Sequence, residues 1–331
     1  MNFSPTEAAA ERRAILLSLV VGTTLLVIKF IAYYLTGSAA IFSDALEGIV
    51  NVLASAFALY AIGLAARPAD AEHPYGHGKI EFMSAGFEGG MILIAALVMA
   101  ARAGEEIIRG PKVQNPGLGV LLMALAMVVN GGVGWYLVRL GRQRHSITLE
   151  ADGHHLLTDA VTSGGVLVAL SLVRLTGVKW IDPIAALVVT FYIGFIAAGL
   201  LRKAVAGLMD QQDLQDEKQL VDLLDSHVGP TGKPPQICSY HKLRHRHSGR
   251  YHWVDFHLTV PAWWDISRGH AIASTIEHEI EQMLGEGNAT AHIEPCTTGD
   301  CGRCAVQREA GGDRSTPSRA NPNDEIRNPN E

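Results

Sequence analysis

Charged residues are scarce in the first two thirds of this sequence. Over all 331 residues they make up 18%, against 48% hydrophobic residues, and the mean hydropathy is +0.16. With a formal net charge of -6 and no basic residues interleaved with aromatics, nothing indicates a nucleic-acid partner. A Walker-type phosphate loop is also missing, so nucleotide hydrolysis is not predicted as an energy source. No catalytic constellation is evident, and we predict that the chain is not an enzyme.

Cysteine is nearly as scarce. The four cysteines all follow the last apolar run, and on a cytosolic side they are expected to be reduced thiols. Three of them, Cys296, Cys301 and Cys304, lie close together, but no fourth ligand is evident, so their role stays open.

Long apolar runs are what the sequence does contain. They fall at residues 14–36, 39–65, 82–101, 117–140, 155–175 and 181–201. Each reaches or approaches the roughly 20 residues that cross a bilayer as a helix, which predicts a six-span membrane protein. Basic residues are more numerous on the side that holds both termini, so we expect both termini in the cytoplasm and the chain in the plasma (inner) membrane.

The fifth run contains an acid and an imidazole on one helix face. His155 and Asp159 are four residues apart, so their side chains project together. An ionised aspartate near the bilayer centre costs about 2.5–3.5 kcal/mol and normally faces a cavity, a partner or a cargo. The pair therefore predicts a cation ligand set; the alternative is a hydrogen bond that only joins helices.

The second run carries a matching polar stripe. Asp44, Glu47 and Asn51 are spaced i, i+3 and i+7 along a helix. If this stripe faces His155 and Asp159, three carboxylates left ionised at depth would cost roughly 8–10 kcal/mol, and a divalent cation or protons would neutralise most of that charge. We predict a cation site between the second and fifth spans. In the third run, Glu88 is either a carboxylate on a packing face or part of a proton route.

The loop after the second run has compact metal-ligand spacing. Asp70, His73 and His77 stand beside glycines that would allow a bend to bring them together. The alternative is that these loop histidines are simply solvated.

From about residue 210 the pattern becomes that of a small α+β domain. We expect helices at 215–228 and 267–284 and strands at 237–244, 251–260 and 289–294, giving an αββαβ order with helices on one face of a three-stranded sheet. The predicted domains are a transmembrane bundle at 1–208, this cytoplasmic domain at 209–295, and a disordered tail at 296–331.

Nine of the fourteen histidines lie in the small domain. Five of its residues sit on four separate elements that can converge on a zinc-like ion: His241, His257, His270, His292 and Glu294. The remaining five histidines, namely His227, His245, His247, His252 and His278, are interpreted as surface residues.

Together these motifs resemble the cation diffusion facilitator, or cation efflux, family, and the resemblance covers the chain to about Pro295. It implies a homodimer of six-span protomers, with a metallochaperone-like cytoplasmic domain, that exports a divalent transition metal in exchange for protons. By similarity, Asp44, His155 and Asp159 belong to the transport site, and Lys79 and Asp210 pair to interlock the dimer. Where the family has a second carboxylate this chain has Gly48, so Glu47, Asn51 or a water supplies the fourth ligand.

The resemblance leaves the cargo and the proton stoichiometry open. A nitrogen and oxygen site without cysteine suits Zn²⁺, Fe²⁺, Co²⁺ or Mn²⁺ and disfavours Cu⁺. No cofactor is expected beyond the transported or regulatory metal ion. The rival function is a membrane-anchored metal sensor, in which the spans only locate the histidine-rich domain.

Overall fold

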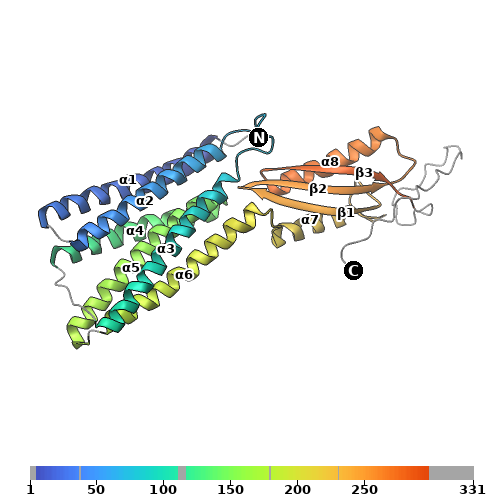
Figure 1. Ribbon diagram of the computed structural model, residues 1–331. Coiled ribbons are helices and arrows are strands. Elements are labelled where there is room, and N and C mark those ends of the chain that lie inside the picture. Colours follow the sequence, from blue (N-terminus) through green and yellow to red (C-terminus); the bar gives the residue numbers. More distant parts are fainter. Residues whose placement is uncertain (1–4, 37–38, 111–116, 179, 230, 298–331) are drawn as a thin grey trace. The chain divides into compact units, whose positions relative to one another are not determined.

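The computed structural model describes residues 5–36, 39–110, 117–178, 180–229 and 231–297, and contacts divide the chain into two units (Figure 1). The first unit comprises residues 1–211 with the turn at 247–251, and the second comprises residues 212–246 and 252–331. The tail predicted to be disordered lies almost entirely outside the described residues.

Six long helices make up the first unit. They are α1 (Pro5–Thr36), α2 (Ala39–Ala65), α3 (Ile80–Arg109), α4 (Gly117–Arg144), α5 (Ile147–Thr176) and α6 (Ile181–Leu208). Within the bundle, α1 packs on α2, α3 on α6 and α4 on α5 (Figure 1). Among the described residues, five helices are long and apolar enough to cross a membrane, and Asn51–Ala65 of α2 is a shorter apolar helical stretch.

Five of the six helices extend beyond the predicted apolar runs, and α3 and α5 show why. Helix α3 continues to Arg109 rather than ending near residue 101, and Arg109 pairs with Glu105 at 2.7 Å one turn away. Helix α5 begins at Ile147, where the Ser146 hydroxyl accepts a hydrogen bond from the backbone N–H of Leu149 at 3.5 Å. Hydropathy marks only the lipid-facing part of a helix, whereas charged residues are good helix formers outside it. His155 therefore lies two turns inside α5, not at its start.

Glycines allow α4 and α5 to approach closely. A Cβ added to Gly153 would lie 2.6 Å from the backbone nitrogen of Val138, and one added to Gly141 would lie 2.6 Å from that of Glu150. Only glycine fits such backbone contacts, which are typical of membrane helix pairs. This close packing holds the first turns of α5, and with them His155, in a fixed place.

The second unit has the predicted αββαβ order. Its elements are α7 (Leu214–His227), β1 (Ser239–Ser248), β2 (Tyr251–Val260), α8 (Ile266–Leu284) and β3 (Gly287–Pro295). The sheet order is β1-β2-β3, and β2 pairs with β3 in parallel, with His257 opposite His292. Asp213 and Asp265 cap α7 and α8 by accepting backbone N–H bonds in the first turn.

One core joins the sheet to both helices. Val254, Phe256 and Leu258 of β2 are almost fully buried and pack with Leu224 of α7 and Ile276 of α8. Since alternate strand residues share a face, both helices cover the same face of the sheet, as predicted. The residues that alternate with these on β2, His257 among them, point to the other face of the sheet.

Candidate metal sites

Asn51 joins the two sequence motifs of the membrane unit. Its Nδ2 donates to Asp159 Oδ2 at 2.6 Å, and its Oδ1 accepts from His155 Nε2 at 2.9 Å. A side-chain amide thus bridges α2 and α5, as the prediction of facing stripes requires. His155 is only 6% exposed, and the side chains of Asp44 and Glu47 lie outside the described residues.

This cluster has the composition of a cation site. A carboxylate, an imidazole and an amide oxygen are all ligands that divalent transition metals accept. A metal ion entering between His155 and Asp159 would replace the proton on His155 Nε2, because only a deprotonated nitrogen coordinates. Asn51 holds both side chains in place and can itself offer its carbonyl oxygen.

The loop residues also come together. Asp70 Oδ1 lies 3.2 Å from His73 Nδ1, Asp70 Oδ2 lies 3.3 Å from His77 Nε2, and the two imidazole centroids are 4.5 Å apart. A tetrahedral ion with bonds of about 2 Å separates its ligand atoms by about 3.3 Å, so the spacing fits a metal ion. The hydrogen bond from the backbone N–H of His73 lowers the pKa of Asp70, which keeps this carboxylate ionised.

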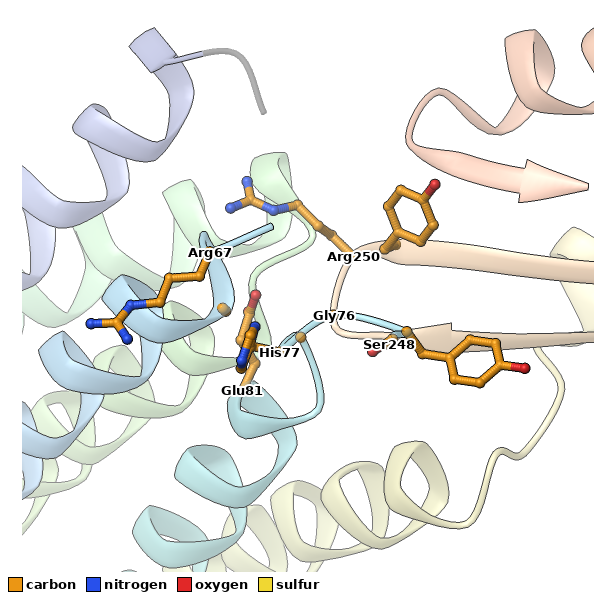
Figure 2. A pocket seen from close by; sticks show the side chains of 10 residues that line it. Arg67, Gly76, His77, Glu81, Ser248 and Arg250 are labelled. Atoms are coloured by element: carbon orange, nitrogen blue, oxygen red, sulfur yellow. The ribbon is translucent and has the colours of Figure 1, made fainter. Parts of the chain in front are cut away.

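His77 anchors the loop cluster to the helical unit. Its side chain is 8% exposed, whereas those of His73 and Asp70 are more than half exposed. Figure 2 shows His77 beside Glu81 in a small pocket of the first unit, which is also lined by Arg67, Gly76, Ser248 and Arg250. The other two ligands remain open to solvent, so an ion can reach them.

The ion pair implied by the resemblance is present as well. Lys79 Nζ lies 2.9 Å from Asp210 Oδ1, joining the start of α3 to the end of α6 within one chain.

In the second unit, Glu294 is the centre of the histidine cluster. His257 Nδ1 lies 2.7 Å from Glu294 Oε1, His241 Nε2 lies 3.2 Å from Glu294 Oε2, and His292 Nε2 lies 4.0 Å from Glu294 Oε1. Partial burial raises the pKa of Glu294, but the hydrogen bond from His257 and the charges of His241, His257 and Lys242 outweigh it, so the pKa is lowered. The carboxylate is therefore ionised and available as a ligand.

The structure brings part of the predicted set together. His241, His257 and Glu294 present ligand atoms within 4.8 Å of one another, and the ring centroid of His292 is 4.8 Å from that of His257. His270, in the first turns of α8, is exposed and is not part of this group of ligand atoms. It lies on a helix that covers the opposite face of the sheet, which sequence spacing did not reveal.

Two histidines assigned to the surface are buried instead. His227 is 0% exposed, with Nδ1 2.9 Å from the carbonyl oxygen of Pro235 and Nε2 3.2 Å from Glu279. His245 is 4% exposed, its Nε2 accepts the backbone N–H of Asp213 at 3.1 Å, and burial lowers its pKa. Both therefore have structural roles at the ends of α7.

The cysteines also differ from expectation. Cys296 is a free thiol, as expected, but Cys238 is disulfide-bonded. Cys301 and Cys304 lie outside the described residues. Separation along the chain gave no information on which sulfur atoms approach one another.

The chain has the architecture of a polytopic membrane protein. Its helical unit contains a polar cluster between two spans, and its small domain contains a histidine cluster. The cation efflux transmembrane domain matches residues 15–209, and the cation efflux protein cytoplasmic domain matches residues 232–296. The chain belongs to the cation efflux family, whose members are transporters.

Relatives along nearly the whole chain agree. An uncharacterized transporter of Synechocystis sp. is 38% identical over 81% of this chain and 85% of its own length. The cation-efflux pump FieF of Shewanella oneidensis is 28% identical over 84% of this chain and 92% of its own length. FieF of Yersinia pestis is 28% identical over 88% of this chain and 95% of its own length. The protein is accordingly a multi-pass membrane transporter for metal cations.

Proposed function

We propose that this protein exports a divalent transition-metal ion from the cytoplasm in exchange for protons. The observation that carries the proposal is the Asn51 bridge between His155 and Asp159, which places an imidazole and a carboxylate from one span against a second span. Asp44, by its helical spacing, adds a carboxylate to this site. Similarity to pumps named for cation efflux supports the direction of transport.

The proton coupling follows from the chemistry of the ligands. On the cytoplasmic side a metal ion displaces protons from His155 and a carboxylate; on the other side reprotonation lowers the metal affinity and releases the ion. Alternating access then requires the helices around the site to rock between two openings. Each net charge moved against 100 mV requires about 2.3 kcal/mol, and protons returning in the other direction offset this.

The cargo belongs to the Zn²⁺, Fe²⁺, Co²⁺ and Mn²⁺ class. Nitrogen and oxygen ligands suit these ions and disfavour Cu⁺. The metal ion is substrate at the membrane site and regulator at the cytoplasmic cluster, and no resident cofactor is proposed.

The assembly we propose is a homodimer in the plasma (inner) membrane with both termini in the cytoplasm. The match to the cytoplasmic domain of cation efflux proteins supports an association through the second unit. Metal at the His241, His257 and Glu294 cluster would tighten the dimer by joining β1, β2 and β3 more firmly.

Transport into liposomes tests the function. Purified protein is reconstituted with a metal-sensitive dye inside, Zn²⁺ is added outside, and the membrane potential is clamped. We expect Zn²⁺ uptake that accelerates when the lumen is made acidic, because luminal protons then leave in exchange. No flux would favour the membrane-anchored sensor, and flux indifferent to the pH gradient would favour a channel; either result contradicts proton-coupled export. A panel of metal ions in the same assay identifies the cargo.

The cytoplasmic cluster gives a second prediction. Replacing Glu294 by Gln removes the one anionic ligand between His241 and His257, so Zn²⁺ affinity of this cluster should fall by at least about tenfold. The measurement is calorimetric titration of the full-length protein in detergent, with dimer content followed in parallel. The matched control is Asp255→Asn, an exposed carboxylate two residues from His257 on the same strand. Equal titration curves for E294Q and the wild type would contradict the assignment.

A further inference from the structure

A second acidic site lies in the membrane unit, apart from the Asp159 site. Glu88 of α3 is 0% exposed and falls between Ala85 and Ile92 on one helical stripe. That stripe belongs to an apolar core that also contains residues of α5 and α6, namely Ala151, Ile193, Ala197, Leu200 and Ala204. Glu88 is thus an acid in the middle of a packing face.

Neither carboxylate oxygen of Glu88 has a hydrogen-bond partner among the described residues. A buried ionised carboxylate without a partner is strongly unfavourable, and such a group holds a proton instead. The arrangement therefore favours a neutral carboxylic acid at Glu88.

Asp152 is the acidic neighbour of Glu88. It is also 0% exposed, and its neighbour Ala151 packs in the same core as Ala85 and Ile92 of α3, where α5 contacts α3. Its Oδ1 accepts from Ser55 Oγ at 2.8 Å, and Ser55 Oγ lies 3.4 Å from Ser18 Oγ. Polar groups from α1, α2 and α5 thus form one layer, and the buried Glu88 lies on the face of α3 that packs with α5.

This layer lies one helical turn from the proposed metal site. Ser55 follows Asn51 by four residues on α2, and Asp152 precedes His155 by three on α5. One turn is about 5.4 Å along a helix axis, so a metal ion at His155 and Asp159 would act strongly on the charges of the layer.

Apolar side chains pack against both chain neighbours of Glu88, and the buried Ser84 lies one turn earlier on α3. Helix α6 brings Leu200 and Leu201 against the neighbouring Gly89, and α2 places the ring of Phe57 edge-on to Phe87 at 5.4 Å. From α5 the buried acidic group beside this core is Asp152, three residues before His155.

We propose that Glu88 and Asp152 form a proton-binding site of this transporter, separate from the site that holds the metal ion; the inference rests on the proposed function. Two carboxylates so enclosed cannot both ionise, so the pair retains at least one proton in the absence of metal. When a divalent cation binds one turn away, its positive charge favours the ionised pair, and the Glu88 proton leaves as Glu88 becomes a carboxylate. Reprotonation of Glu88 after metal release completes the cycle.

The surroundings select a proton over a second metal ion. A zinc-like ion prefers nitrogen or sulfur ligands beside oxygen, whereas this layer and Glu88 offer two carboxylates and two serine hydroxyls among the described residues. A proton needs a single oxygen. The pair is also not among the clusters of three or more metal-ligand side chains in the described residues.

Proton release on metal binding tests this site without requiring transport. Zn²⁺ is titrated into the full-length protein in weakly buffered detergent solution, and protons released per bound ion are counted for the wild type and Glu88→Gln. We expect one proton fewer in E88Q, together with loss of one carboxylic-acid carbonyl band in the infrared spectrum of the metal-free protein. Glu88→Met is the second variant, because its apolar side chain suits the shell around Glu88 and should fold even if the amide does not.

The matched control is Ser84→Ala, a fully buried polar residue one turn away on the same helix, which should release as many protons as the wild type. An unchanged proton count and an unchanged infrared band in E88Q and E88M would overturn the proposal, as would an equal loss in S84A. Absence of pH-driven flux in wild-type liposomes would instead contradict the proposed function, which these two measurements do not assess.

Discussion

Asp159→Asn should abolish pH-driven metal uptake into liposomes while leaving the folded protein intact. The substitution keeps a side chain that can accept a hydrogen bond from Asn51 but removes the negative charge that a metal ion requires. Loss of groups that merely orient a metal ligand lowers affinity by about 10–100-fold, so loss of a charged ligand should lower it at least as much. The measurement is the initial rate of dye-reported uptake at several Zn²⁺ concentrations.

Ser171→Ala is the control for that experiment. Its hydroxyl lies on the same helix, is exposed, and only donates to the carbonyl oxygen of Leu167 at 2.7 Å. S171A should transport at the wild-type rate. Uptake by D159N within a few-fold of the wild type would show that Asp159 packs the helices together and carries no cargo.

Asn51→Leu should lower the apparent metal affinity of transport by about 10–100-fold. Asn51 bonds to Asp159 at 2.6 Å and to His155 at 2.9 Å, so leucine leaves two polar side chains without the amide that positions both. The substitution leaves the metal-binding and proton-binding side chains in place. We therefore expect the Zn²⁺ concentration that gives half-maximal transport to rise more than the maximal rate falls. The same liposome assay, run as a full Zn²⁺ titration, separates the two effects.

Two further variants sharpen the Asn51 prediction. Asn51→Asp keeps an oxygen beside His155 and adds a charge, so it should retain high affinity, most clearly at alkaline pH where the extra carboxylate is ionised. Tyr60→Phe removes an exposed hydroxyl from the same helix and should have no effect. If N51L transports Zn²⁺ with the wild-type apparent affinity, Asn51 is not the fourth metal ligand, and Glu47 or a water molecule takes that place.

Local spacing was enough to predict several of these groups. His155 and Asp159 share a helix face through their separation of four, and Asp70, His73 and His77 are brought together by a short loop. The alternation along β2 predicted which side chains enter the core, because successive strand residues point to opposite faces. In the helix pair and in the loop, the side chains lie close together because few residues separate them in the chain.

Spacing did not predict the environment of a side chain. His227 and His245 look like ordinary surface histidines in the sequence, yet both are buried by contacts with segments distant in the chain. Glu88 was equally ambiguous, since its burial without a hydrogen-bond partner among the described residues depends on apolar side chains of α5 and α6. Burial is set by what packs on top of a residue, and periodicity alone does not give that.

The sequence by itself determined that this is a six-helix membrane protein with a small αββαβ domain, because long apolar runs and alternating strands are properties of contiguous residues. Only the tertiary structure decided that Asn51 bridges His155 to Asp159, that Glu294 lies between His241 and His257, and that Asp152 and Glu88 are both buried. These pairings join residues far apart in the chain, and the packing of whole helices and strands selects which side chains meet.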